Sequence, residues 1–185
     1  MRVLGISGSL RRDSLNSALL RAAAERLPAG AELVEFERLR EIPPYDSDVE
    51  EAGAVPEVVA ELREAVRSAD AVLLATPEYN HSLPGQLKNA LDWISRPAGE
   101  SALRGKPAAA IGASTGMFGA VWAQAEARKV LGALGGRVIE ADLPIPRAAD
   151  QLTDGNLELS PDQSQRLSEI LAELMSEVEE LAVAA

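Results

Sequence analysis

Cysteine is absent from the 185 residues of this chain, and histidine occurs only once, at position 81. Without cysteine the chain has no disulfide bond, no thiolate nucleophile and no Cys-ligated zinc or iron–sulfur centre. One imidazole with no second histidine nearby does not make a metal site, and no G-x-S-x-G motif supplies a serine nucleophile beside it. We therefore expect no bound metal and no chemical role for His81. Any redox chemistry must come from a bound cofactor.

Basic residues are also in short supply. The chain has 18 Lys and Arg residues against 29 Asp and Glu residues, a formal net charge of -11. Such a chain, without a Lys/Arg stripe interleaved with aromatics, repels a phosphate backbone, so we expect no nucleic-acid partner. No apolar stretch is long enough to cross a bilayer, and the first residues, MRVLGISGS, lack the pattern of a signal peptide. We expect a soluble, cytoplasmic protein with no membrane partner.

The length and patterning of the chain indicate one α/β domain. No linker or internal repeat divides residues 1–185, which is an ordinary size for one domain. Short apolar runs alternate with amphipathic stretches, the pattern of crossover βαβ units in a doubly wound parallel sheet with helices on both faces. The expected strands are Val3–Ser7, Glu32–Phe36, Ala71–Thr76, Ala108–Gly112 and Arg137–Glu140.

Amphipathic helices are expected between these strands and after the last of them. The last helix has the clearest start, because Ser160 and Gln163 form a capping box around Pro161. We expect this helix to close an edge of the sheet. The Pro-rich segments 42–45 and 143–147 are expected to be loops. Two of the apolar stripes that indicate helices are Leu19, Leu20, Ala23 and Leu27, and Val58, Val59, Leu62 and Val66.

The loop after the first strand reads GISGSLRRDSLN, residues 5–16. Ligands of doubly wound sheets bind beyond the carboxyl ends of the strands, where a starting helix offers unpaired amides to an anion. Ser9, Ser14 and Asn16 add short polar groups, and Arg11 or Arg12 can add a charge-assisted hydrogen bond to a phosphate. The alternative is that Ser14 or Asn16 merely caps the helix while both arginines are solvated.

Two familiar phosphate-binding motifs are missing from the chain. G-x-G-x-x-G of dinucleotide folds is absent after the first strand, and so is G-x-x-x-x-G-K-[ST] of ATP-binding loops. This absence disfavours NAD and ATP as permanently bound ligands. A monophosphate suits the loop better, by analogy with flavodoxin-like proteins, which bind FMN where the strand order reverses.

The second loop, TPEYNHSLPGQLKNALDWI at residues 76–94, leads from the third strand into a helix. Pro77 fixes a dihedral angle after the strand, and Tyr79 offers a flat face against which a planar heterocycle can lie. Glu78 and Asn80 present backbone groups in a non-helical turn, so we interpret Glu78 as a residue of turn geometry rather than a general acid. The spacing typical of a core stripe is found at Leu87, Leu91, Trp93 and Ile94.

The third loop, GASTGMFGA at residues 112–120, follows the fourth strand. Its glycines allow a flat ligand to approach the backbone closely, and we expect Ser114, Thr115 and Gly116 at the edge of that ligand. Gly-rich turns after strands are frequent, so this loop indicates a ligand site only together with the other two loops beside it.

Together the three loops resemble the NAD(P)H-dependent FMN reductases of flavodoxin-like fold, the branch that includes quinone, azo and chromate reductases. The matching motifs are G-S-L-R-x-x-S-x-N from Gly8 to Asn16, P-E-Y-N from Pro77 to Asn80, and S-x-P-G-x-L-K-N-A-x-D-W from Ser82 to Trp93. The resemblance covers most of the chain and is specific up to about the fourth strand. It implies a five-stranded parallel sheet in the order 2-1-3-4-5.

The resemblance also implies where the cofactor binds. The first loop would hold the FMN phosphate and the P-E-Y-N turn the isoalloxazine ring, and no single side chain is expected to be the catalytic residue. Lys88, Asn89 and Asp92 are either solvated or brace a loop or a subunit contact. The expected cofactor-binding residues are Ser9, Arg11, Ser14, Leu15, Asn16, Pro77, Glu78, Tyr79, Asn80, Ser114, Thr115 and Gly116.

The implied activity is an FMN-dependent transfer of electrons, by a ping-pong mechanism, from NADH or NADPH to a small acceptor such as a quinone, an azo compound or chromate. Because the family commonly places FMN at a subunit interface, we expect a homodimer or homotetramer, with the Pro-rich loops 42–48 and 143–151 reaching over the site or a neighbour. Three alternatives stay open: a reductase that releases reduced FMN to a monooxygenase, a flavodoxin-like electron carrier, and a non-enzymatic nucleotide-binding regulator.

Overall fold

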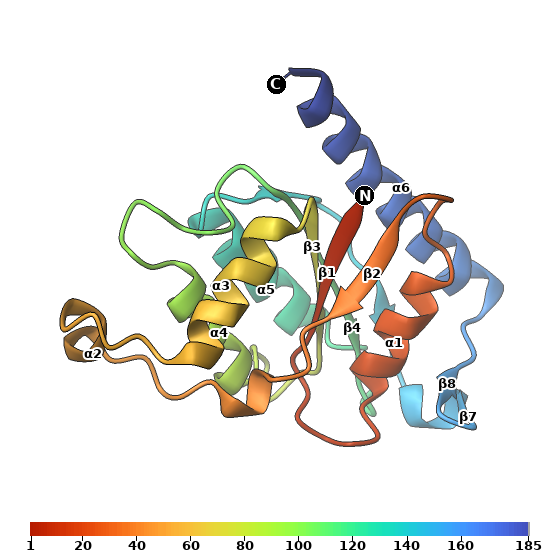
Figure 1. Cartoon of the computed structure of the whole chain (residues 1–185). Coiled ribbons are helices and arrows are strands. Elements are labelled where there is room, and N and C mark those ends of the chain that lie inside the picture. The colour runs from red at the N-terminus through yellow and green to blue at the C-terminus, as the bar shows by residue number, and fades with distance from the viewer. Residues whose placement is uncertain (185) are drawn as a thin grey trace.

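The computed structural model describes residues 1–184 and contains a parallel sheet between two layers of helices (Figure 1). The strand order is β2-β1-β3-β4-β5, and a further strand, β6, also pairs with β4. Every pairing in this sheet is parallel. The predicted α/β fold and strand order are confirmed. The strands are β1 (Arg2–Ser7), β2 (Glu32–Glu35), β3 (Ala71–Thr76), β4 (Pro107–Ala113), β5 (Arg137–Val138) and β6 (Pro144–Ile145).

The fifth strand is shorter than the predicted range 137–140, since the chain leaves the sheet after two residues. The Ile139 amide still donates to the Ala108 carbonyl at 2.8 Å, and the chain then departs and returns to β4 as β6. The prediction of a loop throughout residues 143–147 is therefore wrong. Pro144 lies in an edge strand, where its missing N–H costs no ladder hydrogen bond.

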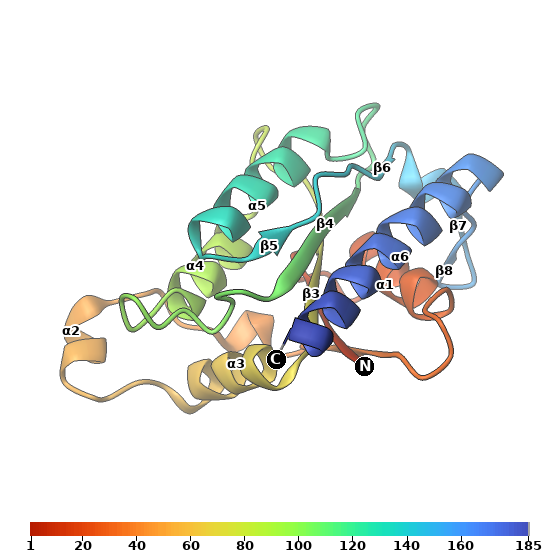
Figure 2. The same ribbon diagram turned by 90° about the horizontal axis from the view of Figure 1, so that it is seen from above.

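Two apolar cores lie on the two faces of the sheet, and helices cover both of these faces (Figure 2). Side chains alternate along each strand, so Leu4, Ile6 and Leu74 pack in one core while Val3 and Leu73 pack in the other. Apolar residues on both faces are typical of parallel strands that helices cover from both sides. The first face carries α3 (Glu57–Ser68), α4 (Gly85–Ile94) and α5 (Val121–Ala133), and the second carries α1 (Leu15–Ala24) and α6 (Pro161–Ala184).

The last helix starts as predicted but packs differently. The Ser160 amide donates to Gln163 Oε1 at 2.8 Å and the Gln163 amide to Ser160 Oγ at 3.3 Å, which confirms the capping box. The expectation that this helix closes a sheet edge is wrong, because α6 crosses the face formed by β3 and β4, beside α1 (Figure 2). The physical reason is a long apolar stripe that only a sheet face can cover, made of Leu167, Ile170, Leu171 and Leu174.

Short elements occupy the remaining connections. Asp154 and Gly155, with φ of 50° and 80°, form the turn of a small hairpin. An Asp-Gly pair is a hairpin signal that the sequence reading missed. None of the helices within residues 1–184 combines the length and apolar character that a bilayer crossing requires. These connecting elements are η1 (Leu39–Glu41), α2 (Ser47–Glu51), η2 (Ala148–Gln151), β7 (Leu152–Thr153) and β8 (Asn156–Leu157).

The Pro-rich segment after η1 is fixed to one side of α4, a contact that we call the α4 face. Gln86 Nε2 donates to the Leu39 carbonyl in η1 at 2.7 Å and to the Ile42 carbonyl at the start of this segment at 2.8 Å. Asn89 Nδ2 donates to the Pro43 carbonyl and its Oδ1 accepts from the Tyr45 amide, both at 2.8 Å. Trp93 Nε1 also donates to the Pro43 carbonyl, at 2.9 Å. Asn89 therefore braces a loop, one of the roles predicted for it.

The other residues predicted on this helix divide between core and solvent. Lys88 Nζ and Asp92 Oδ1 form an ion pair of 2.6 Å on a partly exposed surface. Because these two charges satisfy each other, neither of them braces the Pro-rich segment. The predicted core stripe is confirmed, since the buried residues include Leu87, Leu91, Trp93 and Ile94.

Candidate cofactor site

The carboxyl ends of β1, β3 and β4 bring the three polar loops together. They enclose a cavity of about 100 Å³. All of the predicted cofactor-binding residues line this cavity except Ser14, Asn80 and Gly116. The lining residues are Ser9, Arg11, Leu15, Asn16, Pro77, Glu78, Tyr79, Ala113, Ser114 and Thr115.

A glycine brings the first loop close to the second. The Gly8 amide donates to the Ala75 carbonyl at 2.8 Å, at the end of β3. A Cβ atom at Gly8 would lie 2.8 Å from Leu87 Cδ2 and 3.2 Å from Pro77 Cδ. Any larger residue would therefore push the first loop away from the second and open the cavity between them.

The side chains of Ser14 and Asn16 are already occupied within the protein. Ser14 Oγ accepts from the amides of Asn16 at 3.2 Å and Ser17 at 3.1 Å, so it caps α1, as the alternative interpretation held. Asn16 is buried, and its side chain forms two hydrogen bonds of 3.0 Å with the amide and carbonyl of Ala113. This pair of bonds joins the first loop to the third. The side chains of Ser14 and Asn16 therefore have structural roles within the protein.

The other polar groups of the first loop face outward. The Arg11 guanidinium is exposed and forms no hydrogen bond or ion pair within residues 1–184. Ser9 Oγ accepts only a long hydrogen bond of 3.4 Å, from the Arg11 amide. Guanidinium, hydroxyl and helix N-terminus together suit a phosphate, because each stabilises negative charge.

The second loop presents Tyr79 on a tight turn. Tyr79 and Ser82 exchange two backbone hydrogen bonds of 3.1 Å, and Asn80 and His81 between them have φ of 54° and 61°. Asn80 is therefore the left-handed residue that makes the turn and does not line the cavity. The Tyr79 side chain stands beside the cavity with 51% of its surface exposed.

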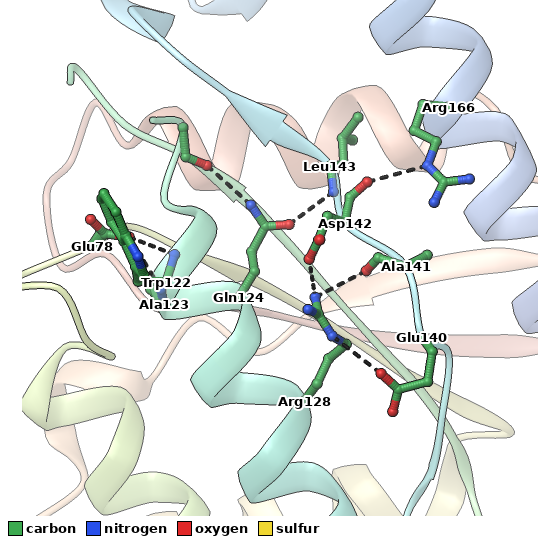
Figure 3. Close-up of polar contacts among 11 residues, drawn as sticks. Glu78, Trp122, Ala123, Gln124, Arg128, Glu140, Ala141, Asp142, Leu143 and Arg166 are labelled. Carbon is green, nitrogen blue, oxygen red and sulfur yellow. Dashed lines mark hydrogen bonds and ion pairs between the residues drawn. The ribbon is translucent and has the colours of Figure 1, made fainter. Parts of the chain in front are cut away.

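Glu78 links the second loop to α5. Its Oε2 accepts from the backbone amides of Trp122 at 3.0 Å and Ala123 at 3.1 Å, in the first helical turn (Figure 3). The helix has no cap of its own, since Ala120 at the N-cap position is left-handed and has no side-chain acceptor. The carboxylate thus supplies the missing cap and favourable charge at a helix N-terminus. No local sequence signal could have revealed this contact, because 44 residues separate Glu78 from Trp122.

The third loop is fixed to β6 on one side, and its backbone is open to a ligand on the other side. The Ser114 amide donates to the Ile145 carbonyl at 3.1 Å, which ties the loop to β6. A Cβ atom at Gly119, where φ is 58°, would lie 2.6 Å from the Ile145 nitrogen, so packing requires glycine there. At Gly116 a Cβ atom would meet only Ser114 Oγ, at 3.8 Å. Packing within the chain therefore does not require Gly116, and the loop stays open to a ligand on that side.

A buried glutamine supports this arrangement. Gln124 Nε2 donates to the Gly119 carbonyl at 3.0 Å, and Gln124 Oε1 accepts from the Leu143 amide at 2.9 Å (Figure 3). One side chain of α5 thus fixes both the third loop and the segment that leads into β6. The sequence analysis did not identify Gln124, because a single polar residue on a helix gives no indication of such a bridge.

Exposed apolar side chains gather beside the cavity. The Trp122 ring makes edge contacts with the His81 and Phe118 rings, with centroid distances of 4.8 Å in both pairs. Met117 is also exposed on this loop. Within residues 1–184 no group of His, Asp or Glu side chains has the geometry of a metal site. His81 therefore belongs to an aromatic surface in this structure.

The residues present fit FMN. The first loop offers an unpaired guanidinium, a hydroxyl and a helix N-terminus to the phosphate end. The second and third loops offer the exposed Tyr79 ring and the open backbone at Gly116 to a flat ring. In flavodoxin-like sheets this edge is also where the strand order reverses.

Comparison with known proteins agrees with this geometry. Residues 1–150 match the family model described as NADPH-dependent FMN reductase. Over 131 residues the chain is 50% identical to an NAD(P)H-dependent FMN reductase of Pseudomonas aeruginosa and 39% identical to a quinone reductase of Escherichia coli, in each case covering 71% of this chain and 69% of the relative.

A solved structure shows the same likeness over nearly the whole chain. The flavoenzyme NAD(P)H:(acceptor) oxidoreductase FerB from Paracoccus denitrificans superimposes with a TM-score of 0.83 and 32% identity, covering 97% of both chains. The family match spans residues 1–150, a range that contains all three loops. The chain therefore belongs to the NADPH-dependent FMN reductase family, an oxidoreductase family that uses FMN and NAD(P)H.

Proposed function

We propose that this protein is an NAD(P)H:quinone-type oxidoreductase that works by a ping-pong cycle through FMN bound in the three-loop cavity. One observation carries the proposal: three loops from distant parts of the chain converge on a single cavity, whose lining includes the exposed Arg11 guanidinium and the exposed Tyr79 ring. This arrangement supports a ligand with an anionic end and a flat end.

When bound, FMN accepts a hydride from NAD(P)H and passes the electrons to an acceptor. Arg11 and Ser9 would hold the phosphate end, with help from the backbone of Leu15. Pro77 and Tyr79 would orient the flat end, and the backbone at Thr115 and Gly116 would place N–H dipoles near it. No side chain of the chain needs to donate or accept a proton during hydride transfer.

The open side of the site supports this order of binding. The three loops cover the cavity from the sheet side, and the exposed Tyr79 ring borders solvent. Donor and acceptor would then use the same open side in turn, which is compatible with a ping-pong cycle. For the acceptor we propose a quinone, since relatives from Escherichia coli and Burkholderia are named quinone reductase and 2-hydroxy-1,4-benzoquinone reductase. Azo compounds and chromate are further candidates.

The predicted single domain, cytoplasmic location and homodimer or homotetramer stay predictions. The exposed surface of Tyr79, Phe118 and Trp122 supports an assembly in which a second copy borders the site, because exposed apolar patches often mark interfaces. Sedimentation of the FMN-loaded protein tests this part. A monomer with full activity would contradict it.

Absorbance spectra of the purified protein test the function. Without oxygen, addition of NADPH or NADH should bleach the oxidised-flavin bands, and benzoquinone should restore them in an amount equal to the bound flavin. Bands that neither donor bleaches would instead identify an electron carrier. A colourless protein that consumes NAD(P)H only with added FMN would identify a reductase that releases reduced flavin.

A further inference from the structure

A carboxylate lines the candidate FMN cavity beside the residues proposed for the flat end of the cofactor. The charged side chains among the lining residues are Arg11 and Glu78. Arg11 lies on the first loop, proposed for the phosphate, whereas Glu78 lies between Pro77 and Tyr79 in the second loop. The Glu78 side chain is only 13% exposed, so water screens its charge poorly. A negative charge therefore borders the space in which the flat ring of FMN would lie.

The position of this carboxylate is fixed by α5 rather than by a cationic side chain. Glu78 Oε2 accepts the hydrogen bonds from the amides of Trp122 and Ala123 (Figure 3). Within residues 1–184 no Lys or Arg side chain forms an ion pair with Glu78. His81 Nδ1 lies 3.7 Å from Oε1, on a side chain that is 76% exposed. A helix N-terminus supplies a positive charge of only about half a unit, so the site keeps a net negative charge at Glu78.

Reduction changes the charge of FMN in this space. A hydride from NAD(P)H carries two electrons and one proton, so the donor leaves as NAD(P)⁺ and the reduced ring has one added negative charge. Charges of like sign repel each other more strongly in a partly closed cavity than in water. The Glu78 carboxylate therefore disfavours reduced FMN relative to oxidised FMN.

We propose that Glu78 lowers the reduction potential of bound FMN and so makes the reduced cofactor a stronger electron donor. This inference rests on the proposed function, because it needs FMN in the three-loop cavity. Two contributions have the same sign: the carboxylate repels the added charge, and it cancels the positive end of α5, which would otherwise stabilise that charge. Electron transfer to the acceptor gains the driving force that reduction by NAD(P)H loses.

The third loop acts in the opposite direction. Its backbone amides at Thr115 and Gly116 would stabilise the added charge, since the loop is open to a ligand there. The potential of bound FMN is then a balance between these amides and the Glu78 carboxylate. Only the carboxylate belongs to a side chain, so it is the part of the balance that a substitution can remove.

The test is the reduction potential of FMN bound to Glu78→Gln, which loses the charge and keeps an oxygen that can cap α5. We expect the ratio of the Kd for oxidised FMN to the Kd for reduced FMN to rise about tenfold, which corresponds to about 30 mV for a two-electron couple. Slow anaerobic reduction by dithionite beside a reference dye measures the potential. Titration of the FMN-free protein with both forms of FMN measures the two Kd values.

Two further variants separate the charge from the cap. Glu78→Asp keeps the charge on a shorter side chain, so it should lower stability and shift the potential less than Glu78→Gln does. Asp162→Asn removes an exposed carboxylate from the first turn of α6, on the opposite face of the sheet, and should leave the potential unchanged. An unchanged or lower potential in Glu78→Gln would overturn the proposal. An equal rise in Glu78→Asp or in Asp162→Asn would do the same.

Rapid mixing without oxygen tests the direction of the effect. In Glu78→Gln, bleaching of the flavin by NADPH should become faster and its reoxidation by benzoquinone slower, because the driving force moves from the second step to the first. The opposite pair of changes contradicts the proposed role of Glu78.

The two proposals fail in different ways. If neither NADPH nor NADH bleaches the bound flavin, the proposed function fails, while the potential measured with dithionite still tests Glu78. If both donors bleach it and Glu78→Gln has the potential of the unsubstituted protein, the carboxylate does not set the potential and the proposed function stands.

Discussion

Polar and aromatic side chains occur both at the α4 face and at the carboxyl end of the sheet, but their hydrogen bonding differs. At the α4 face, Gln86, Asn89 and Trp93 donate hydrogen bonds to the backbone of η1 and of the Pro-rich segment. At the carboxyl end, the Arg11 guanidinium has no partner among residues 1–184 and Tyr79 is half exposed. One region is complete without a ligand, and the other is not.

This difference distinguishes a motif that stabilises the fold from a motif that binds a ligand, although the same family resemblance identified both. The segment from Ser82 to Trp93 belongs to the family pattern as much as the first loop does. Yet its residues are explained by contacts within the chain, since a satisfied hydrogen bond contributes stability by itself. Residues left unsatisfied around a cavity are explained only by what binds there.

The largest expected difference between the two regions is in the free energy of unfolding that is lost when the tryptophan of each region is replaced. Trp93 is fully buried and hydrogen-bonded, so Trp93→Ala should lower the free energy of unfolding by about 3–5 kcal/mol. Trp122, with 41% of its surface exposed, should cost less than about 1 kcal/mol when changed to Ala. Urea denaturation of the FMN-free proteins measures both. Equal losses would erase the distinction between the regions.

The next effect concerns FMN affinity. Arg11→Ala should weaken FMN binding by about 1.5–3 kcal/mol, a tenfold or greater rise in Kd, because a charge-assisted hydrogen bond is lost. The FMN-free protein should unfold at the same urea concentration as before, since Arg11 has no partner in it. Asn89→Ala is the matched opposite and should lower stability without changing the Kd for FMN. Unchanged FMN affinity in Arg11→Ala would contradict the assignment of the site.

Glu78 is an intermediate case, because it lines the cavity and its carboxylate nevertheless accepts hydrogen bonds from backbone amides of α5. Glu78→Ala removes the cap of α5 and should cost about 1 kcal/mol of stability. Glu78→Gln keeps an acceptor oxygen and should recover most of this loss. Thermal unfolding of the three FMN-free proteins measures the difference. A full loss of turnover in FMN-loaded Glu78→Gln, at unchanged stability, would instead give this carboxyl a chemical role.

The smallest effect depends on pH. Hydrogen bonds from the Arg38 guanidinium lower the pKa of the Glu41 carboxyl. A lowered folded-state pKa gives stability that is present above the unfolded value of about 4.3 and is lost as the pH falls. Glu41→Gln should therefore make the loss of stability in acid less steep. The urea midpoint measured between neutral pH and pH values below 4.3 checks this, and an unchanged slope would show that the exposed pair contributes nothing.

The fold was predictable because its signals are local. The capping box at Ser160 and the core stripe on α4 each follow from residues close together in sequence, whereas the strand order was implied by the family resemblance. The errors came where tertiary contacts decide. The sheet edge at Pro144 and the position of α6 on the sheet face depend on what packs against them.

The candidate site was predictable in position and less so in detail. Loops after β1, β3 and β4 must meet at one edge of the sheet, so the cavity followed from the strand order. The hydrogen bonds of the Asn16, Glu78 and Gln124 side chains could not be predicted from the strand order, because each side chain bonds to backbone groups of another segment.

The two hydrogen bonds between Asn16 and Ala113 also set an order of events during synthesis. The two residues are 97 positions apart, so the side chain of Asn16 finds its partner only after β4 has left the ribosome. Closing so long a loop is a slow step compared with the formation of α1. Until then the first loop has no fixed position relative to the third. A nascent chain therefore acquires the three-loop cavity late, and a fragment that ends before residue 113 contains the first loop without the cavity.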